Sequence, residues 1–187
     1  GERFAHVSLR VPGLHNVKNA LAAAAAAAAL GVSGEAVERG LGQFGGAGRR
    51  FEYKGSFRGA EIYDDYAHHP GELKALLDAA HTLGYQRVIC AFQPHTYTRT
   101  AALFDDFVEV LKQPDVALLA EIYAARETND IGISSEDLAA RIPGARYCAT
   151  LPEVTAALRE LARPGDLILT VGAGDIYTAG EALVGEA

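Results

Sequence analysis

The sequence predicts an α/β protein in which a doubly wound, mainly parallel β-sheet follows a helical amino-terminal segment. Short apolar runs at 87–92, 116–120 and 166–171 have the length and composition of buried strands. Stretches with the spacing of amphipathic helices separate these runs, and this alternation is typical of parallel sheets. Each run ends in polar or glycine residues, as expected where ligands bind at the carboxyl edge of such a sheet.

The composition is that of a globular protein. The chain has 187 residues, of which 49% are hydrophobic and 22% are charged. A formal charge of −7 argues against nucleic acid as a partner. No apolar run is long enough for a membrane span and no signal peptide is recognisable, so we expect a cytoplasmic protein with Cys90 and Cys148 reduced. Because the sequence contains no methionine, we expect it to be a fragment of a longer chain.

The amino-terminal part predicts one strand and two helices. Residues 3–11 alternate in the manner of a strand, which Pro12-Gly13 ends. The alanine-rich run predicts a helix that is capped by Asn16 and ended by Gly31. Its small side chains predict close packing against another element. A second helix follows the cap Ser33, and a cluster of glycines at 40–48 then predicts a boundary.

The remaining residues predict a hairpin followed by alternating helices and strands. The hairpin pairs 51–57 with 60–65 around Arg58-Gly59. The expected helices lie at 72–83, around 100–112, around 135–141, at 152–161 and after Gly174, and the expected strands at 87–92, 116–120, near 147–148 and at 166–171.

The segment Ile62–Pro70 concentrates chemically active side chains. It reads Ile-Tyr-Asp-Asp-Tyr-Ala-His-His-Pro, and Pro70 suits the first turn of the next helix. Two carboxylates and two histidines at the end of a strand favour a binding or catalytic role. The alternative is a polar turn in which Asp64 or Asp65 caps the helix, but capping needs only one such side chain.

Three further strand ends, at 93–100, 121–127 and 172–175, carry polar or glycine residues, and four such ends on one edge favour a ligand site. His95 is a candidate for this site, and the alternative is that it has only a structural role in its loop. Arg99 near a helix amino terminus favours a bound anion, because a cation is otherwise unfavourable there.

Two of these ends also have plain structural interpretations. Glu121 and Arg126 alternatively form an ion pair with each other. Gly172-Ala173-Gly174 at a helix start offers free N–H groups to an anion, whereas Asp175 alternatively caps that helix.

Five motifs occur in an order that resembles the Mur ligases of peptidoglycan synthesis. They are His15-Asn16-Val17-Lys18-Asn19-Ala20, Arg49-Arg50-Phe51-Glu52, Asp64-Asp65-Tyr66-Ala67-His68-His69-Pro70, Phe92-Gln93-Pro94-His95 and Gly172-Ala173-Gly174-Asp175. The resemblance covers nearly the whole chain. The double histidine and the Gln-Pro-His motif favour the branch of the family that adds L-alanine to UDP-N-acetylmuramate.

The resemblance implies a three-domain enzyme. Residues 1–46 would be the tail of the central ATP-binding domain, and residues 47–187 the complete Rossmann-like carboxyl-terminal domain. The phosphate loop of the family, Gly-x-x-x-x-Gly-Lys-[Ser/Thr], is absent because no Gly-Lys pair occurs. The fragment would therefore be inactive alone, and most residues that bind ATP and Mg²⁺ would lie in the missing amino-terminal and central domains.

The implied reaction is amide formation. ATP phosphorylates the muramate carboxylate, and the amine of L-alanine attacks the acyl phosphate. By the resemblance, the nucleotide would be bound by His15, Asn16, Asn19, Arg50 and Asp65. The amino acid and the reacting carboxylate would be faced by Tyr66, His68, His95 and Arg99, with His68, His95 and Arg99 catalytic and with Gly172 and Gly174 assisting. No residue of this chain is assigned as a metal ligand.

The sequence departs from the family at Thr96, where some relatives have arginine, and at Lys18 in the asparagine motif. Four alternatives remain. They are a murein tripeptide recycling ligase, a ribokinase-like sugar kinase suggested by residues 171–175, a metal-dependent hydrolase using Asp65, His68 and His69, and a non-catalytic binding domain.

Overall fold

The computed structural model describes residues 3–185, which divide into two compact units at the bond between Gly48 and Arg49. We call residues 3–48 the first unit and residues 49–185 the second unit. Among the described residues, no helix has both the length and the apolar character needed to cross a membrane.

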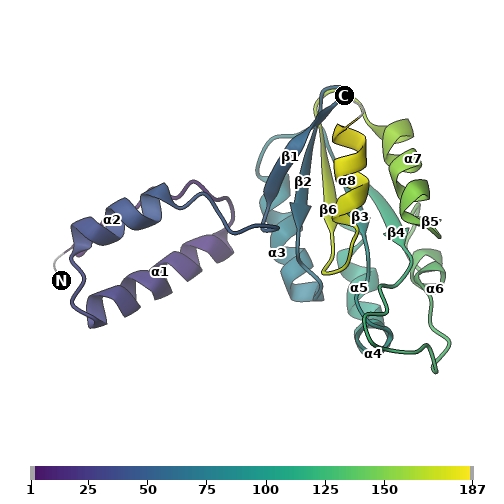
Figure 1. Ribbon diagram of the computed structural model, residues 1–187, viewed down its shortest axis with the longest axis horizontal. Coiled ribbons are helices and arrows are strands. Elements are labelled where there is room, and N and C mark those ends of the chain that lie inside the picture. Colours follow the sequence, from purple (N-terminus) through teal and green to yellow (C-terminus); the bar gives the residue numbers. More distant parts are fainter. Residues whose placement is uncertain (1–2, 186–187) are drawn as a thin grey trace. The chain divides into compact units, whose positions relative to one another are not determined.

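The first unit consists of α1 (Leu14–Ala29) and α2 (Gly34–Gln43), which Figure 1 shows as a helical pair. Ser33 caps α2 as predicted, because its hydroxyl accepts the N–H of Ala36. Gly31 follows α1 with a φ of +78°, which confirms its expected place after the helix.

Three expectations for the first unit are wrong. Residues 3–11 form no strand, since an alternating pattern needs a partner strand to make a ladder. They run close to α2 instead, where a Cβ on Gly34 would lie 1.9 Å from the carbonyl oxygen of Phe4. Gly13 precedes α1 in the cap position, while the amide of Asn16 donates to the carbonyl of Pro12. No residue of α1 is buried, so its expected close packing is absent from the described chain.

The second unit is built on one sheet of six strands in the order β1-β2-β6-β3-β4-β5. Its strands are β1 (Glu52–Phe57), β2 (Ala60–Asp65), β3 (Arg87–Phe92), β4 (Val116–Ala120), β5 (Arg146–Cys148) and β6 (Asp166–Val171). Only β1 is antiparallel, paired with β2 in the predicted hairpin, and the other neighbours are parallel. The structure thus confirms a doubly wound, mainly parallel sheet.

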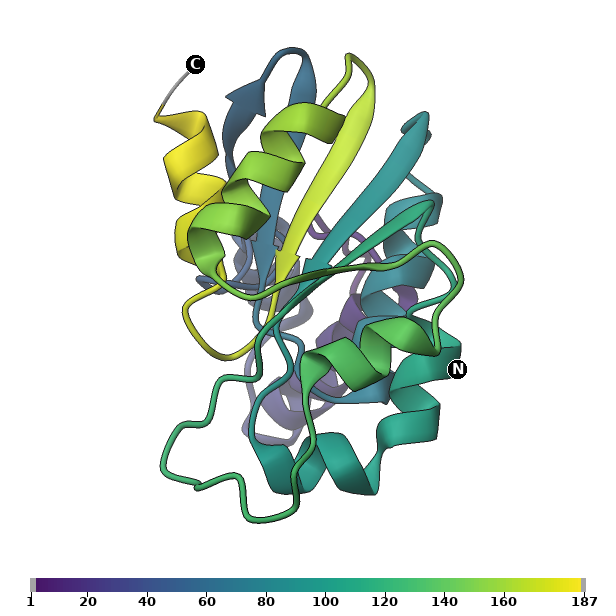
Figure 2. The same ribbon diagram turned by 90° about the vertical axis from the view of Figure 1, so that its right-hand side faces the viewer.

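Helices cover both faces of this sheet (Figures 1 and 2). They are α3 (Pro70–His81), α4 (Tyr97–Ala102), α5 (Phe104–Val110), α6 (Ser135–Ala140), α7 (Leu151–Leu161) and α8 (Tyr177–Val184). The single helix expected around 100–112 is two helices, because Leu103 between them has a φ of −117° and a ψ of 23°, outside the helical range.

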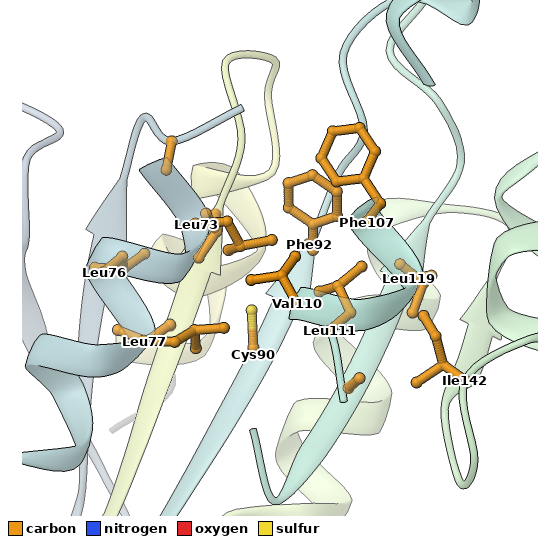
Figure 3. Packing of buried hydrophobic residues seen from close by; sticks show 14 of the residues in the cluster. Leu73, Leu76, Leu77, Cys90, Phe92, Phe107, Val110, Leu111, Leu119 and Ile142 are labelled. Carbon is orange, nitrogen blue, oxygen red and sulfur yellow. The ribbon is translucent and has the colours of Figure 1, made fainter. Parts of the chain in front are cut away.

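The alternation of side chains along the central strands divides the core into two clusters. On one face, Cys90 and Phe92 of β3 pack with Leu73 and Leu77 of α3 and with Phe107 of α5 (Figure 3). On the other face, the intervening strand residues pack against α7 and α8. Strands that are buried on both faces hold their carboxyl ends rigidly, and this positions the loops described next.

Candidate functional site

Four parallel strands end together at one edge of the sheet, which we call the carboxyl rim together with the loops that follow. Asp65 of β2 is opposite Val171 of β6, and Val171 is opposite Phe92 of β3. Beyond β3 and β4, the main chain continues as an isolated parallel bridge between His95 and Tyr123. The rim therefore brings together the four strand ends that the sequence singled out.

Arg49 joins two of these loops. Its Nε donates to Asp64 Oδ2 at 2.8 Å, and its Nη1 and Nη2 donate to the carbonyls of Gly174 and Gly172 at 3.1 and 2.8 Å. The guanidinium also lies over the rings of Tyr66 and Tyr177, 5.0 and 4.7 Å from their centroids. All three nitrogens are thus committed within the protein, so Arg49 holds the rim together.

The main chain of Arg49 is fixed as well. Its N–H donates to Glu52 Oε2 at 2.6 Å, and its carbonyl accepts the N–H of Tyr66 at 2.7 Å. The neighbouring Arg50 is exposed, with its guanidinium 5.8 Å from the centroid of the Tyr66 ring. The sequence predicted a role for Arg50 and none for Arg49, although the two adjacent arginines already indicated that either could belong to the site.

Gln93, which is 5% exposed, fixes the loop between β6 and α8 from the other side. Its Oε1 accepts the N–H groups of Asp175 and Ile176, and its Nε2 donates to Asp175 Oδ1. Gly174 must be glycine here, because a Cβ would lie 2.4 Å from Gln93 Oε1 and 2.6 Å from the Tyr123 ring. The Phe-Gln-Pro-His motif was noted in the sequence, but this role of its glutamine was not.

One of the three N–H groups of the expected anion site at residues 172–174 is engaged within the protein. The N–H of Gly172 donates to the carbonyl of Asp65, and α8 begins only at Tyr177. Within the described chain, Ala173 and Gly174 keep free N–H groups. Asp175 does not cap α8, because Ile176 occupies the cap position. The ribokinase-like interpretation thus loses the amide donor of Gly172, and its aspartate, Asp175, accepts from Gln93.

The two aspartates of the Ile62–Pro70 segment are buried and have separate partners. Asp64 accepts from Arg49 and from the hydroxyl of Thr170, whereas Asp65 accepts the N–H groups of Phe51 and Ala67. Burial raises the pKa of both carboxyls, although these hydrogen bonds act in the opposite direction. Neither aspartate caps α3, so that alternative is wrong.

His69 is the cap of α3. Its ring Nδ1 accepts the N–H of Gly71, and the side chain of Glu72 accepts its backbone N–H, which completes a reciprocal cap. Pro70 is the first residue of the helix, as predicted. Because His69 caps the helix and Asp65 binds two backbone N–H groups, two of the three groups required by the hydrolase interpretation are engaged elsewhere.

A row of rings crosses the rim from β2 to β4. The ring centroids of Tyr66 and His68 are 5.5 Å apart, those of His68 and His95 are 6.0 Å apart, and those of His95 and Tyr123 are 5.6 Å apart. His68 and His95 come from different loops, so the fold brings together the two histidines chosen from the sequence. Tyr66 and Tyr123 at the ends of the row are 36% and 38% exposed, which leaves them accessible to a ligand.

Each histidine in the row has a polar partner at Nδ1. Arg99 Nη1 lies 3.3 Å from His95 Nδ1, and the carbonyl of Tyr66 lies 3.0 Å from His68 Nδ1. Burial lowers the pKa of His95, and the positive charge of Arg99 lowers it further.

The loop after β4 stabilises the turn into α4. Glu127 accepts from the N–H and the hydroxyl of Thr98 at the start of α4. Thr96, the departure noted in the sequence, has a φ of +71°, an uncommon conformation for a β-branched residue. Glu121 accepts from the hydroxyl of Tyr147, and the ion pair between Glu121 and Arg126, which the sequence left open as an alternative, is not present among the described residues.

The remaining nucleotide-binding candidates belong to the first unit. His15 and Asn19 are exposed on the first turns of α1, and Asn16 between them is partly exposed. The second unit contains every other candidate, namely Arg50, Asp65, Tyr66, His68, His95, Arg99, Gly172 and Gly174.

Comparison with protein families gives one matching model, the Mur ligase, glutamate ligase domain, over residues 49–174. The chain is 48% identical to the UDP-N-acetylmuramate–L-alanine ligase of Agathobacter rectalis over 188 residues, covering 98% of this chain and 41% of that protein. It is 47% identical to the ligase of the same name from Salinibacter ruber, covering 98% of this chain and 40% of that protein. The chain therefore spans about two fifths of the length of these relatives.

Solved structures show the same likeness. The UDP-N-acetylmuramate-alanine ligase of Thermotoga maritima superposes with a TM-score of 0.83 at 28% identity, covering 100% of this chain and 40% of that one. A murein peptide ligase from Psychrobacter arcticus superposes with a TM-score of 0.69 at 26% identity, covering 96% of this chain and 38% of that one.

Proposed function

Because the chain belongs to the Mur ligase family, we propose that it is the carboxyl-terminal part of an ATP-dependent ligase that joins L-alanine to UDP-N-acetylmuramate. The observation that carries the proposal is 48% identity to an alanine-adding ligase across 98% of the chain. The row of rings and the arginines at the carboxyl rim supply polar groups suited to an amino acid and an activated carboxylate. We place the reaction in the cytoplasm, where ATP and nucleotide sugars occur.

We assign residues 1–46 to the tail of a central ATP-binding domain and residues 47–187 to the Rossmann-like carboxyl-terminal domain. The division of the structure after Gly48, within the glycine-rich segment, supports a boundary there. The relatives are about two and a half times as long as this chain, which supports the existence of upstream domains. Those domains would supply the phosphate loop and the Mg²⁺ ligands, and the chain alone would be inactive.

The residues present fit part of a nucleotide site. Arg50 is exposed, and its guanidinium is suited to a phosphate oxygen. Asp65 fixes the backbone next to Arg50 by accepting the N–H of Phe51, and its oxygens retain lone pairs for a ribose hydroxyl. His15, Asn16 and Asn19 would contact the adenine. When bound, ATP would supply the phosphoryl group that activates the muramate carboxylate.

The amino-acid side of the reaction would use the row of rings and Arg99. Arg99 would hold the carboxylate of L-alanine, because a guanidinium binds carboxylates by paired hydrogen bonds. Tyr66 and the two histidines would exclude water and align the amine with the acyl phosphate, since positioning supplies much of the rate in such reactions. The free N–H groups of Ala173 and Gly174 would assist with a developing negative charge.

The test is a turnover assay on the full-length enzyme that contains this chain. With UDP-N-acetylmuramate present, we expect ADP release that depends on L-alanine and a product heavier by one alanine residue. Turnover with the tripeptide L-alanyl-γ-D-glutamyl-diaminopimelate, but none with alanine, would show the recycling ligase instead. No ADP release with either amino component would overturn the assignment. Arg50→Ala or Asp65→Ala should cripple turnover without unfolding the protein, and normal kinetics in both would remove these residues from the site.

A further inference from the structure

The partners of His95 determine which of its nitrogens carries a proton. A guanidinium only donates hydrogen bonds, so the Nδ1 atom that lies 3.3 Å from Arg99 Nη1 must be the acceptor. The ring is then neutral, with its hydrogen on Nε2. Burial and the charge of Arg99 also lower the pKa of His95, which supports the neutral form. His95 therefore has an N–H donor as its remaining polar atom.

His68 has the opposite arrangement. A carbonyl oxygen only accepts, so the Nδ1 atom 3.0 Å from the carbonyl of Tyr66 must carry the hydrogen. In the neutral ring, Nε2 then keeps its lone pair. The two adjacent histidines of the row thus have complementary free atoms, an acceptor on His68 and a donor on His95.

The charged groups around the two rings also differ, with a carboxylate beside His68 and a guanidinium beside His95. Glu72 Oε2 lies 3.6 Å from His68 Nδ1 and is held there by the backbone N–H groups of His68 and His69. Burial opposes the ionisation of Glu72, but these hydrogen bonds and the nearby positive charge lower its pKa overall. Glu72 thus places a carboxylate beside the Nδ1 atom of His68, an arrangement also found in catalytic histidine–carboxylate pairs.

A proton gained by His95 would meet the reverse situation. Arg99 and His68 both disfavour a positive charge on this ring, and Glu127 only partly offsets them. Neighbouring titratable groups whose surroundings differ in this way commonly divide acid and base functions between them.

We propose that His68 is the general base that removes a proton from the incoming amino group, and that His95 is a fixed hydrogen-bond donor to the anionic end of the same site. This inference deepens the proposed function and rests on it. In the step itself, the ammonium group gives one proton to His68 Nε2, and its nitrogen pair attacks the acyl carbon of the acyl phosphate. The C–N bond forms, the C–O bond to phosphate breaks with its electron pair passing to the phosphate oxygen, and the second proton lost by the nitrogen leaves on that phosphate.

The first test needs no activity and uses the chain as it stands. Long-range ¹H–¹⁵N correlation spectra at neutral pH should show the Nδ1–H tautomer for His68 and the Nε2–H tautomer for His95. His81 is the matched control, because its Nδ1 lies 2.7 Å from the carbonyl of Leu77 and should also carry the hydrogen. The same tautomer at His68 and His95, or an Nε2–H tautomer at His68, would overturn the inference.

The second test uses the full-length enzyme and separates the two histidines. His68→Gln should lower kcat for alanine by about 10²- to 10⁴-fold, with a much smaller change in KM, because an amide cannot take up the proton. His95→Gln keeps an N–H donor and should retain more activity than His95→Leu. The control His81→Gln, on the far end of α3, should behave as the unchanged enzyme does.

The choice of nucleophile makes the test specific to proton removal. Hydroxylamine is already unprotonated at neutral pH, so it should restore product formation in His68→Gln, but not in His95→Leu. Undiminished alanine kinetics in His68→Gln would overturn the base assignment. Inactivity of the unchanged enzyme with alanine would instead refute the proposed function, while leaving the tautomer measurement valid.

Discussion

Replacing Arg49 tests whether one side chain holds the carboxyl rim together. Asp64 is fully buried, and within the described residues 3–185 its side chain accepts from Arg49 and Thr170, so Arg49→Ala leaves a buried carboxylate with one hydroxyl donor. Removing one partner of a buried ion pair costs about 3–5 kcal/mol. The side chain of Arg49 is 25% exposed, so water softens the loss, and we expect a decrease of about 3 kcal/mol in unfolding free energy.

The sequence provides a clean assay for this change. The chain has eight tyrosines and no tryptophan, and all eight tyrosines lie between residues 53 and 177. Tyrosine fluorescence during urea unfolding of the intact chain therefore reports on the second unit alone. Arg50→Ala is the matched control, because that arginine is exposed, and we expect it to change stability by less than about 1 kcal/mol.

A double-mutant cycle identifies the cause. If the orphaned carboxylate produces the loss, Asp64→Asn should recover part of it in the Arg49→Ala background, with a coupling of about 1–3 kcal/mol. Arg49→Lys keeps the charge but has no planar fork for the carbonyls of Gly172 and Gly174, so it should recover less than half. A loss below about 1 kcal/mol, together with additive single changes, would refute the reasoning.

Three further predictions concern the core, the packed loop and pH. Leu77→Ala should cost about 2–5 kcal/mol in urea unfolding, whereas Leu83→Ala, at a site that is 40% exposed, should cost less than about 1. Gly174→Ala forces a Cβ into the loop beside α8 and should lower the thermal midpoint by circular dichroism. Gly40→Ala in α2 meets no atom within 4 Å and should raise the stability of that helix. Folding lowers the pKa of His95, so the unfolded chain takes up a proton at this residue more readily than the folded chain does. The folded protein should therefore keep its full stability above about pH 6.5 and lose stability as pH falls below that value. The stability of His95→Gln should therefore decline less between neutral and mildly acidic pH, and equal declines would contradict the shift.

The strands of the sheet were predictable because burial determines their composition. Residues 87–92, 116–120 and 166–171 form β3, β4 and β6 with the predicted bounds. A strand covered by helices on both faces is apolar at nearly every position, and the change to polar residues marks where it leaves the core. The same reasoning located the carboxyl rim, since parallel neighbours must end on one side.

Expectations failed where a local pattern was not supported by a tertiary partner. Residues 3–11 alternate like a strand, but they lie beside α2 and pair with no other strand in the described chain. The alanine-rich helix α1 forms because of propensity, yet side chains of one carbon bury little surface and do not define a packing face. Sequence alone indicates which segments tend to be helical, but not which surfaces meet.

The functions of identical residues at the rim are set by partners that lie far away in sequence. Arg49 and Arg50 are adjacent and chemically equal, but the carbonyls at Gly172 and Gly174, more than a hundred residues away, bind the first and leave the second exposed. His68 and His95 likewise differ in the hydrogen-bond partner at Nδ1, which is a carbonyl in one case and a guanidinium in the other. A donor-only neighbour makes a histidine a donor at its free nitrogen, and an acceptor-only neighbour makes it a base. The types of residue at this edge of the sheet therefore predict a reactive site. The hydrogen-bond partner at Nδ1 of each histidine then decides whether that histidine can act as a base or as a donor.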